Sequence, residues 1–307
     1  MKRTCLTLAA TMAVLALAVS ACGNNNPTQT GSKATGSPAP SDTIVVGSAN
    51  FQESVVLANI YAEALKAKGV KVSTKLNIGS REAYIPGLED GSIDLIPEYS
   101  GVLLQYFDKA ATAVAPDEVY AALQKALPGD LTVLQKSAAE DKDAVVVTKA
   151  TADKYKLTSI ADLKDVAGKL TFGGAPEFKT RPDGVPGLKK NYGVTFGSYK
   201  TLDAGGPLSV NGLKNGQVDA ADIFTTDPSI AANNFVVLQD PKNNFAAQNV
   251  LPLINKAKAS DTVTGALDAV SAKLTTQTLI DLLTKVTADK QDPNAVAKEW
   301  LSSQGLG

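Results

Sequence analysis

The residues with the clearest chemical potential lie in two similar stretches, LEDGSIDLIPEYSG at 88–101 and LKNGQVDAADIFTTD at 213–227. Each places an acidic side chain, Glu98 or Asp222, shortly before an aromatic side chain and a hydroxyl. Two carboxylates that faced each other across a cleft could hydrolyse a glycosidic bond. An aromatic face could instead hold a cation. The two stretches are therefore compatible with catalysis or with binding.

The composition of the chain removes most catalytic machinery. There is no histidine, and the two cysteines, Cys5 and Cys22, both lie near the N-terminus. A Ser-His-Asp triad, a Cys-His pair, a histidine zinc site and a disulfide in the folded part are therefore impossible. Acidic residues at strand ends more often cap loops or pair with lysine. The sequence thus predicts no enzyme, no catalytic residue, no cofactor and no metal, with a carboxylate-based hydrolase as the least favoured alternative.

Size and charge set further bounds. A chain of 307 residues that is 44% hydrophobic and 20% charged can bury a sizeable core and is long enough for about two domains. The net charge is only -1, and no run of Lys and Arg follows the first residues. A nucleic-acid partner is therefore not expected.

The N-terminal segment has the pattern of an export signal. Lys2 and Arg3 precede an apolar run at 6–19 that is too short to span a membrane. The following VSAC resembles a lipoprotein signal, which implies cleavage of residues 1–21 and lipidation of Cys22; an ordinary secretory signal is the alternative. Residues 22–42, rich in Gly, Ser, Pro, Thr and Asn, would form a flexible tether. We expect a lipid-anchored protein on the outer face of the cytoplasmic membrane.

Strands and helices alternate along the chain from Thr43 onward. Apolar runs predict strands at 43–49, 71–78, 92–100, 143–149, 169–175, 218–226, 234–240 and 249–256. Helical spacing of apolar residues predicts helices at 50–69, 80–91, 116–127, 159–166, 205–216, 261–274, 275–286 and 292–301. This alternation is typical of an α/β fold with mainly parallel sheets covered on both faces.

Local signals refine the helix ends. Asn50 with Glu53 three residues later predicts a capped N-terminus at the end of the first strand. Pro86 should interrupt the helix at 80–91 or delay its start. Asp292 followed by Pro293 predicts the cap and first residue of the last helix.

The two similar stretches occupy equivalent places in this pattern. Each would be a helix that ends at a left-handed glycine, Gly91 or Gly216, followed by a buried strand. Ligands of open α/β sheets bind beyond the carboxyl ends of strands, so Tyr99, in a loop, and Phe224 would face each other across a cleft. The alternative is that a common helix-glycine-strand phrase recurs by chance.

The order of elements predicts two lobes joined by two crossings. Residues 43–142 and 248–307 would form lobe 1, because the helical tail should pack back on the first α/β unit. Residues 143–247 would form lobe 2.

Four segments together resemble a known family. GSANFQES, GLEDGSIDLIPEYSG, FGGAPEFKTRPDGVPGLKKNYG and LKNGQVDAADIFTTD are similar, in order and spacing, to segments of the substrate-binding lipoproteins of osmoprotectant ABC importers. The resemblance covers residues 44–306. It implies the type II periplasmic-binding-protein fold and a receptor that delivers glycine betaine, choline, carnitine or proline betaine to ABC permease subunits. We expect a monomer.

The resemblance also implies a binding site, but this chain keeps only part of it. A quaternary ammonium is held by aromatic faces, and Arg can hold a carboxylate. Tyr99 matches a cage tyrosine of the family and Arg181 its carboxylate-binding arginine. Asp143, Val210, Gln248 and Asn249 stand where relatives have further cage tyrosines, and Ala49 and Val102 replace a lysine and a threonine.

These departures leave the ligand open. The residues predicted to bind it are Tyr99, Arg181, Asp143, Gln248, Asn249, Asn50, Phe51, Ser54 and Thr225. In one interpretation Asp143 is the anionic partner of a choline-like cation. In the other, the polar cleft binds a different polyhydroxylated or amine solute. A surface sensor lipoprotein with the same fold is a third possibility.

Overall fold

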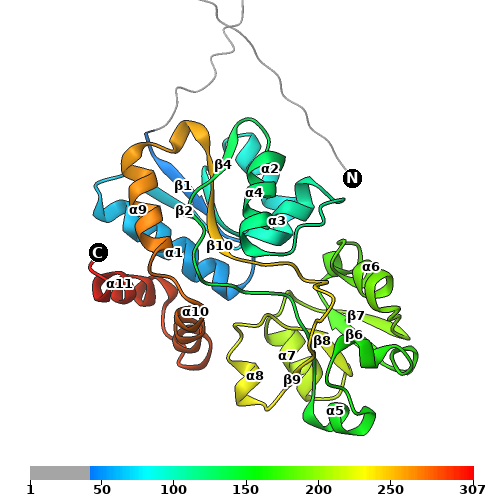
Figure 1. Ribbon diagram of the computed structural model, residues 1–307. Coiled ribbons are helices and arrows are strands. Elements are labelled where there is room, and N and C mark those ends of the chain that lie inside the picture. The colour runs from blue at the N-terminus through cyan, green and yellow to red at the C-terminus, as the bar shows by residue number, and fades with distance from the viewer. Residues whose placement is uncertain (1–41) are drawn as a thin grey trace, which may run out of the picture. The chain divides into compact units, whose positions relative to one another are not determined.

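The computed structural model describes residues 42–307 (Figure 1). The predicted signal peptide, Cys22 and all but the last residue of the predicted tether lie outside the described residues. No helix within 42–307 is long and apolar enough to cross a membrane.

The first of two five-stranded sheets has the order β2-β1-β3-β10-β4. Its strands are β1 (Ile44–Gly47), β2 (Val72–Lys75), β3 (Leu95–Tyr99), β4 (Leu131–Val133) and β10 (Val250–Asn255). β1 pairs in parallel with β2 and β3, whereas β10 runs antiparallel to β3 and β4. The helices of this part are α1 (Gln52–Ala67), α2 (Arg81–Glu89), α3 (Ser100–Phe107), α4 (Pro116–Ala126), α9 (Asp261–Ser271), α10 (Thr276–Leu283) and α11 (Pro293–Ser303).

The second sheet has the order β7-β6-β8-β5-β9. Its strands are β5 (Val145–Val147), β6 (Thr171–Gly174), β7 (Ser198–Thr201), β8 (Ala220–Asp222) and β9 (Val236–Val237). β6 pairs in parallel with β7 and β8, and β5 runs antiparallel to β8 and β9. Its helices are α5 (Lys149–Tyr155), α6 (Val185–Gly187), α7 (Pro207–Lys214) and α8 (Ser229–Ala232).

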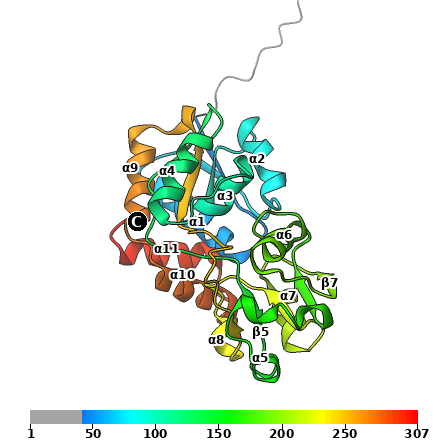
Figure 2. The same cartoon turned by 45° about the vertical axis from the view of Figure 1, so that its right-hand side comes forward.

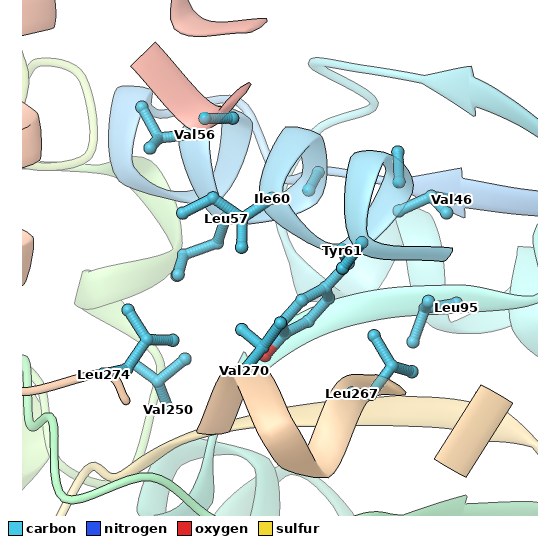
Figure 3. Packing of buried hydrophobic residues seen from close by; sticks show 14 of the residues in the cluster. Val46, Val56, Leu57, Ile60, Tyr61, Leu95, Val250, Leu267, Val270 and Leu274 are labelled. Carbon is cyan, nitrogen blue, oxygen red and sulfur yellow. The ribbon is translucent and has the colours of Figure 1, made fainter. Parts of the chain in front are cut away.

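α1 is the central helix of the first core. Leu57, Ile60 and Tyr61 are fully buried, and they pack with Leu267 and Val270 of α9 in one hydrophobic cluster (Figure 3). α10 and α11 lie against α1 in both views (Figures 1 and 2). Burial of each such side chain stabilises the fold by about 1.5–3 kcal/mol. The C-terminal helices therefore hold α1, and the loop before it, firmly in place.

Two crossing segments join the sheets and run side by side (Figure 1). The Val250 N–H donates to the Ala139 carbonyl at 3.0 Å, and the Asp141 N–H donates to the Gln248 carbonyl at 3.2 Å. These hydrogen bonds hold the two crossing segments together as an antiparallel pair.

β3 brings an acidic and an aromatic side chain to the end of the first sheet. Pro97 of β3 lies opposite Pro252 of β10 in the antiparallel register. Opposite residues of an antiparallel pair either exchange two hydrogen bonds or exchange none. Proline has no N–H, so Pro97 and Pro252 form a pair of the second kind, in which neither has to donate to the other. Glu98 and Tyr99 can therefore follow inside a regular, buried strand.

Several local predictions are wrong for identifiable reasons. Phe51, not Asn50, is the N-cap of α1, and it makes no side-chain cap. The Glu53 carboxylate instead accepts hydrogen bonds from the Tyr99 and Thr226 hydroxyls, which are distant in the sequence. Pro86 lies inside a continuous α2. Tyr99 ends β3 rather than occupying a loop.

The extent of parallel pairing was also overestimated. Only three adjacent strands of each sheet are parallel, because β10 and β5 enter their sheets from the crossing segments and run the other way. The strand predicted at 218–226 is shorter, as β8 ends at Asp222. The segment at 159–166 forms only a 3-10 turn at Ile160–Leu163.

The helix-end glycines and the last helix follow the predictions. Gly91 and Gly216 have φ values of 76° and 67°. Asp292 caps α11 by accepting the Ala295 N–H, and Pro293 is the first residue of that helix.

Candidate functional site

A small cavity opens between the two sheets. Its lining comes from the loop after β1, the first turns of α2, the junction of β3 and α3, the crossing segments and the second sheet's loops. The lining residues are Ala49, Asn50, Phe51, Ser80, Arg81, Tyr84, Tyr99, Val102, Asp141, Asp143, Glu177, Arg181, Ala204, Phe224 and Gln248.

Three aromatic rings form one wall of the cavity. The Phe51 ring centroid lies 6.0 Å from that of Tyr99 and 5.1 Å from that of Phe224. Phe51 and Tyr99 come from the first lobe and Phe224 from the second, so the wall spans both. The Tyr99 hydroxyl is already engaged, because it donates to Glu53 Oε1 at 2.7 Å. The ring faces are therefore what this wall offers a ligand.

A buried ion pair lies at the base of α2. Arg81 donates from Nε and Nη2 to the two Glu98 oxygens, at 2.7 and 2.8 Å. The Tyr84 hydroxyl and the Tyr99 N–H also donate to this carboxylate. Although burial by itself lowers the pKa of Arg81, the charge of Glu98 raises it well above its ordinary value. Glu98 is thus a structural partner of Arg81 and has no free oxygen pair for acid-base chemistry.

A second arginine reaches across the cavity. Arg181, just after the 3-10 turn Pro176–Lys179, donates from Nε and Nη2 to Glu82 of α2, at 3.3 and 3.2 Å. Burial raises the pKa of Glu82, but hydrogen bonds from Ser80 and Arg181 and the charge of Arg181 outweigh it and lower this pKa to about 2. The pair links the two lobes.

Three carboxyl groups gather at the second-lobe side. Asp143 lines the cavity, and Asp222 and Asp183 lie close enough to it to perturb its ionisation or to be perturbed by it. Burial raises the pKa of Asp143 and of Asp222, and it raises the pKa of Asp183 to about 7. Asp222 Oδ1 and Asp183 Oδ2 are buried and receive no hydrogen bond from the described residues.

Glu53 and Asp141 form another buried carboxyl pair where the lobes meet. The Thr226 hydroxyl donates to Glu53 Oε2 at 2.6 Å, and its N–H donates to Asp141 Oδ1 at 3.1 Å. Thr225 Oγ1 donates to the same Asp141 oxygen at 3.2 Å. Burial raises the pKa of both acids. The cavity therefore combines aromatic faces with an excess of carboxyl groups, an arrangement that can hold a small cation. Among residues 42–307, no group of three or more His, Cys, Asp or Glu side chains is arranged to hold a metal ion.

Comparison with known proteins decides the family. The family model described as the substrate binding domain of an ABC-type glycine betaine transport system matches residues 42–303. The chain belongs to this family. It is therefore a substrate-binding protein of an ABC importer, which binds a small solute, works with permease subunits and is not an enzyme.

Individual relatives agree with the family assignment. The glycine betaine-binding protein YehZ of Escherichia coli is 27% identical over 276 residues, which cover 85% of this chain and 90% of that protein. A glycine-betaine-binding protein of Pseudomonas aeruginosa is 26% identical over 284 residues, covering 87% and 90%. A crystal structure described as a glycine betaine/carnitine/choline ABC transporter has a TM-score of 0.68 at 24% identity, covering 86% and 99%. The substrate-binding protein thus has the two-lobed type II periplasmic-binding-protein fold.

Six of the nine predicted ligand-binding residues line the cavity of this substrate-binding protein. They are Asn50, Phe51, Tyr99, Asp143, Arg181 and Gln248. Gln248 is partly committed, since its Oε1 accepts the Val102 N–H at 2.9 Å.

The other three lie behind the cavity wall. Ser54 is buried and accepts the Ala49 N–H, which shapes the loop after β1. Asn249 donates to the Ser137 carbonyl within the crossing segments. Thr225 bonds Asp141 and the Lys142 N–H. These residues shape the wall and do not face the cavity.

Sequence reasoning missed Arg81, Tyr84, Asp141 and Glu82 as components of the site. Arg81 and Glu82 directly follow Ser80, the N-cap of α2, so their position at a helix start was a usable signal. For Asp141, the only signal was its place in the first crossing.

Proposed function

We propose that the cavity binds a small, ammonium-bearing solute of the osmoprotectant type and delivers it to ABC permease subunits. The observation that carries this proposal is the aromatic wall of Phe51, Tyr99 and Phe224 beside Asp141 and Asp143. Aromatic faces attract a cation through the ring quadrupole, and buried carboxyl groups ionise more readily beside a cation and then attract it by charge. Both relatives named above are described as glycine betaine-binding proteins, which supports the same class of ligand.

The mechanism follows from the placement of these groups on both lobes. We take lobe 1 as 43–142 with 248–307, and lobe 2 as 143–247. A solute in contact with Phe51 of lobe 1 and Phe224 of lobe 2 gains more contacts when the lobes are closed. Only such differential affinity can shift a hinge equilibrium toward the closed form. The closed, loaded form would then dock on the permease, with a lipid on Cys22 holding a monomeric receptor at the outer face of the membrane.

A polyhydroxylated solute is the second candidate ligand. It is favoured by Asn50 and Gln248, whose amides line the cavity. A sensor function would use the same cavity, and loss of solute uptake on deletion of the gene would separate delivery from sensing.

The test is a thermal-shift screen of the purified protein followed by calorimetry. The panel contains glycine betaine, choline, carnitine, proline betaine and polyhydroxylated solutes. A solute at 100 times its Kd adds about 2.7 kcal/mol to the free energy of unfolding. Phe224→Leu, which removes the aromatic face and keeps an apolar side chain, should weaken binding of an ammonium solute about tenfold, as expected for a desolvated cation–π contact.

Tyr155→Leu is the matched control, because Tyr155 packs in the second-lobe core and not on the cavity. It should leave the affinity unchanged. A panel in which only polyhydroxylated solutes bind, with affinity insensitive to Phe224→Leu, would replace the first candidate by the second.

A further inference from the structure

We infer that the cavity selects a cation that carries no carboxylate, because Glu82 already occupies the Nε–Nη2 edge of the Arg181 guanidinium group. The inference rests on the proposed function and specifies the class of solute within it. Glu82 is then the residue that sets specificity, through its contact with Arg181.

Both oxygens of Glu82 engage Arg181. The contacts are Nε to Oε1 at 3.3 Å and Nη2 to Oε2 at 3.2 Å, a paired geometry that a carboxylate of a ligand would otherwise adopt. Ser80 Oγ also donates to Glu82 Oε2, at 2.6 Å, which orients the side chain. Glu82 lies in the first turn of α2, where the helix dipole favours a negative charge. The glutamate is therefore held in place from three directions.

The other arginine of the cavity is committed as well. Arg81 pairs with Glu98 through two hydrogen bonds, and both side chains are buried. The described lining of the cavity contains no further Lys or Arg. Each positive charge that a ligand carboxylate could approach is thus neutralised by a carboxylate of the protein.

The remaining titratable groups around the cavity are acidic. Asp141, Asp143 and Glu177 line it, and Asp222 and Asp183 lie behind Asp143. The orphaned oxygens Asp222 Oδ1 and Asp183 Oδ2 lack a donor in the described residues. An ammonium group on the solute would favour the ionised form of these acids and be attracted by it, whereas a carboxylate on the solute would disfavour that form and gain no attraction from them.

Competition adds to this preference. A ligand carboxylate can take the paired contact with Nε and Nη2 of Arg181 only by displacing Glu82, which is tethered beside these atoms. A tethered group competes at an effective concentration on the order of millimolar or more, and displacement also leaves Glu82 without its partner. The carboxylate of a zwitterion therefore contributes little to affinity here.

Choline and glycine betaine form a matched pair of probes. Both carry the same trimethylammonium group, and they differ in having a hydroxymethyl or a carboxylate. Calorimetry on the purified protein should show choline binding at least about tenfold more tightly, since like-charge juxtaposition is costly. Glu82→Gln keeps the side-chain shape and removes the charge that occupies Arg181. It should shift the ratio of the two affinities at least about tenfold toward glycine betaine.

Glu89→Gln is the control for this substitution. Glu89 is an exposed residue at the other end of α2 and does not line the cavity, so the ratio should stay as in the unmodified protein. Equal or tighter binding of glycine betaine by the unmodified protein would overturn the inference. A ratio that Glu82→Gln leaves unchanged would also overturn it. Binding of neither probe and of no other ammonium solute in the panel would overturn the proposed function itself, which makes the two failures distinguishable.

Discussion

The buried Arg81–Glu98 pair yields the sharpest prediction about the wall of the cavity. The arginine is 6% exposed and the glutamate 0%, and they are joined by hydrogen bonds of 2.7 and 2.8 Å. Arg81→Met keeps an unbranched side chain that follows the apolar stem of the arginine and removes the charged guanidinium group. The buried Glu98 carboxylate would then keep only two hydrogen-bond donors, the Tyr84 hydroxyl and the Tyr99 N–H. Loss of one partner from such a pair typically costs about 3–5 kcal/mol.

The assay is urea unfolding at equilibrium, followed by circular dichroism and by the fluorescence of Trp300, the single tryptophan of the chain. Arg81→Met should lower the free energy of unfolding by about 3–5 kcal/mol. The double variant Arg81→Met, Glu98→Gln should lose less than the sum of the two single changes, by about 0.5–3 kcal/mol, because neither charge is then left alone.

An exposed ion pair serves as the control. Lys285 and Glu299 lie 2.9 Å apart with side chains 37% and 61% exposed, so Lys285→Met should cost less than about 1 kcal/mol. If Arg81→Met cost no more than this control, or if the two changes at the buried pair were additive, the claim that Arg81 and Glu98 depend on each other would be refuted.

Two further predictions concern protonation and packing. Burial raises the pKa of Asp183 to about 7, so the folded protein holds a proton that the unfolded chain releases near pH 4. The free energy of unfolding should therefore fall as the pH rises from about 4 to about 7, by up to about 1.4 kcal/mol per unit, and Asp183→Asn should flatten this slope in urea titrations. A rise over that range would contradict the assignment. Gly101→Ala would bring a Cβ to 2.6 Å from the Ala247 carbonyl oxygen and should cost about 1–3 kcal/mol in the same assay. Gly129→Ala, with no atom within 4 Å of its added Cβ, should change the free energy of unfolding by less than about 0.5 kcal/mol. If Gly101→Ala cost no more than Gly129→Ala, the crossing segment at Ala247 would have to move aside without cost, and the prediction would be refuted.

Local features of the sequence predicted much of the architecture. The alternation of apolar runs with helical periodicity indicated an α/β fold, and most strands and long helices formed where the pattern placed them. Glycines at helix ends and the Asp292-Pro293 start of α11 behave as their local chemistry requires. These signals could be read because each depends on neighbours within a few residues.

The site was predicted in part. Tyr99 and Arg181 were found from a motif resemblance, and both line the cavity. Ser54 and Asn249 were assigned to the site because their polar groups suit a ligand, yet each is used by the fold: Ser54 bonds the loop after β1, and Asn249 bonds a crossing segment. A polar side chain near a site can bond either a ligand or the protein's own backbone, and the sequence does not show which of the two lies within hydrogen-bond distance.

The sequence by itself determined the absence of histidine chemistry, the alternating elements and the family to which the chain is similar. Only the tertiary structure decided which charges meet. Arg181 pairs with Glu82 from 99 positions away, and Thr226 bonds Glu53 from 173 positions away. Asn50 does not cap α1. Glu53, the other residue of the expected cap, instead accepts hydrogen bonds from Tyr99 and Thr226. The physical reason is that a charge leaving water takes whatever partner the packed lobes bring within hydrogen-bond distance, and that partner is set by the approach of the two sheets.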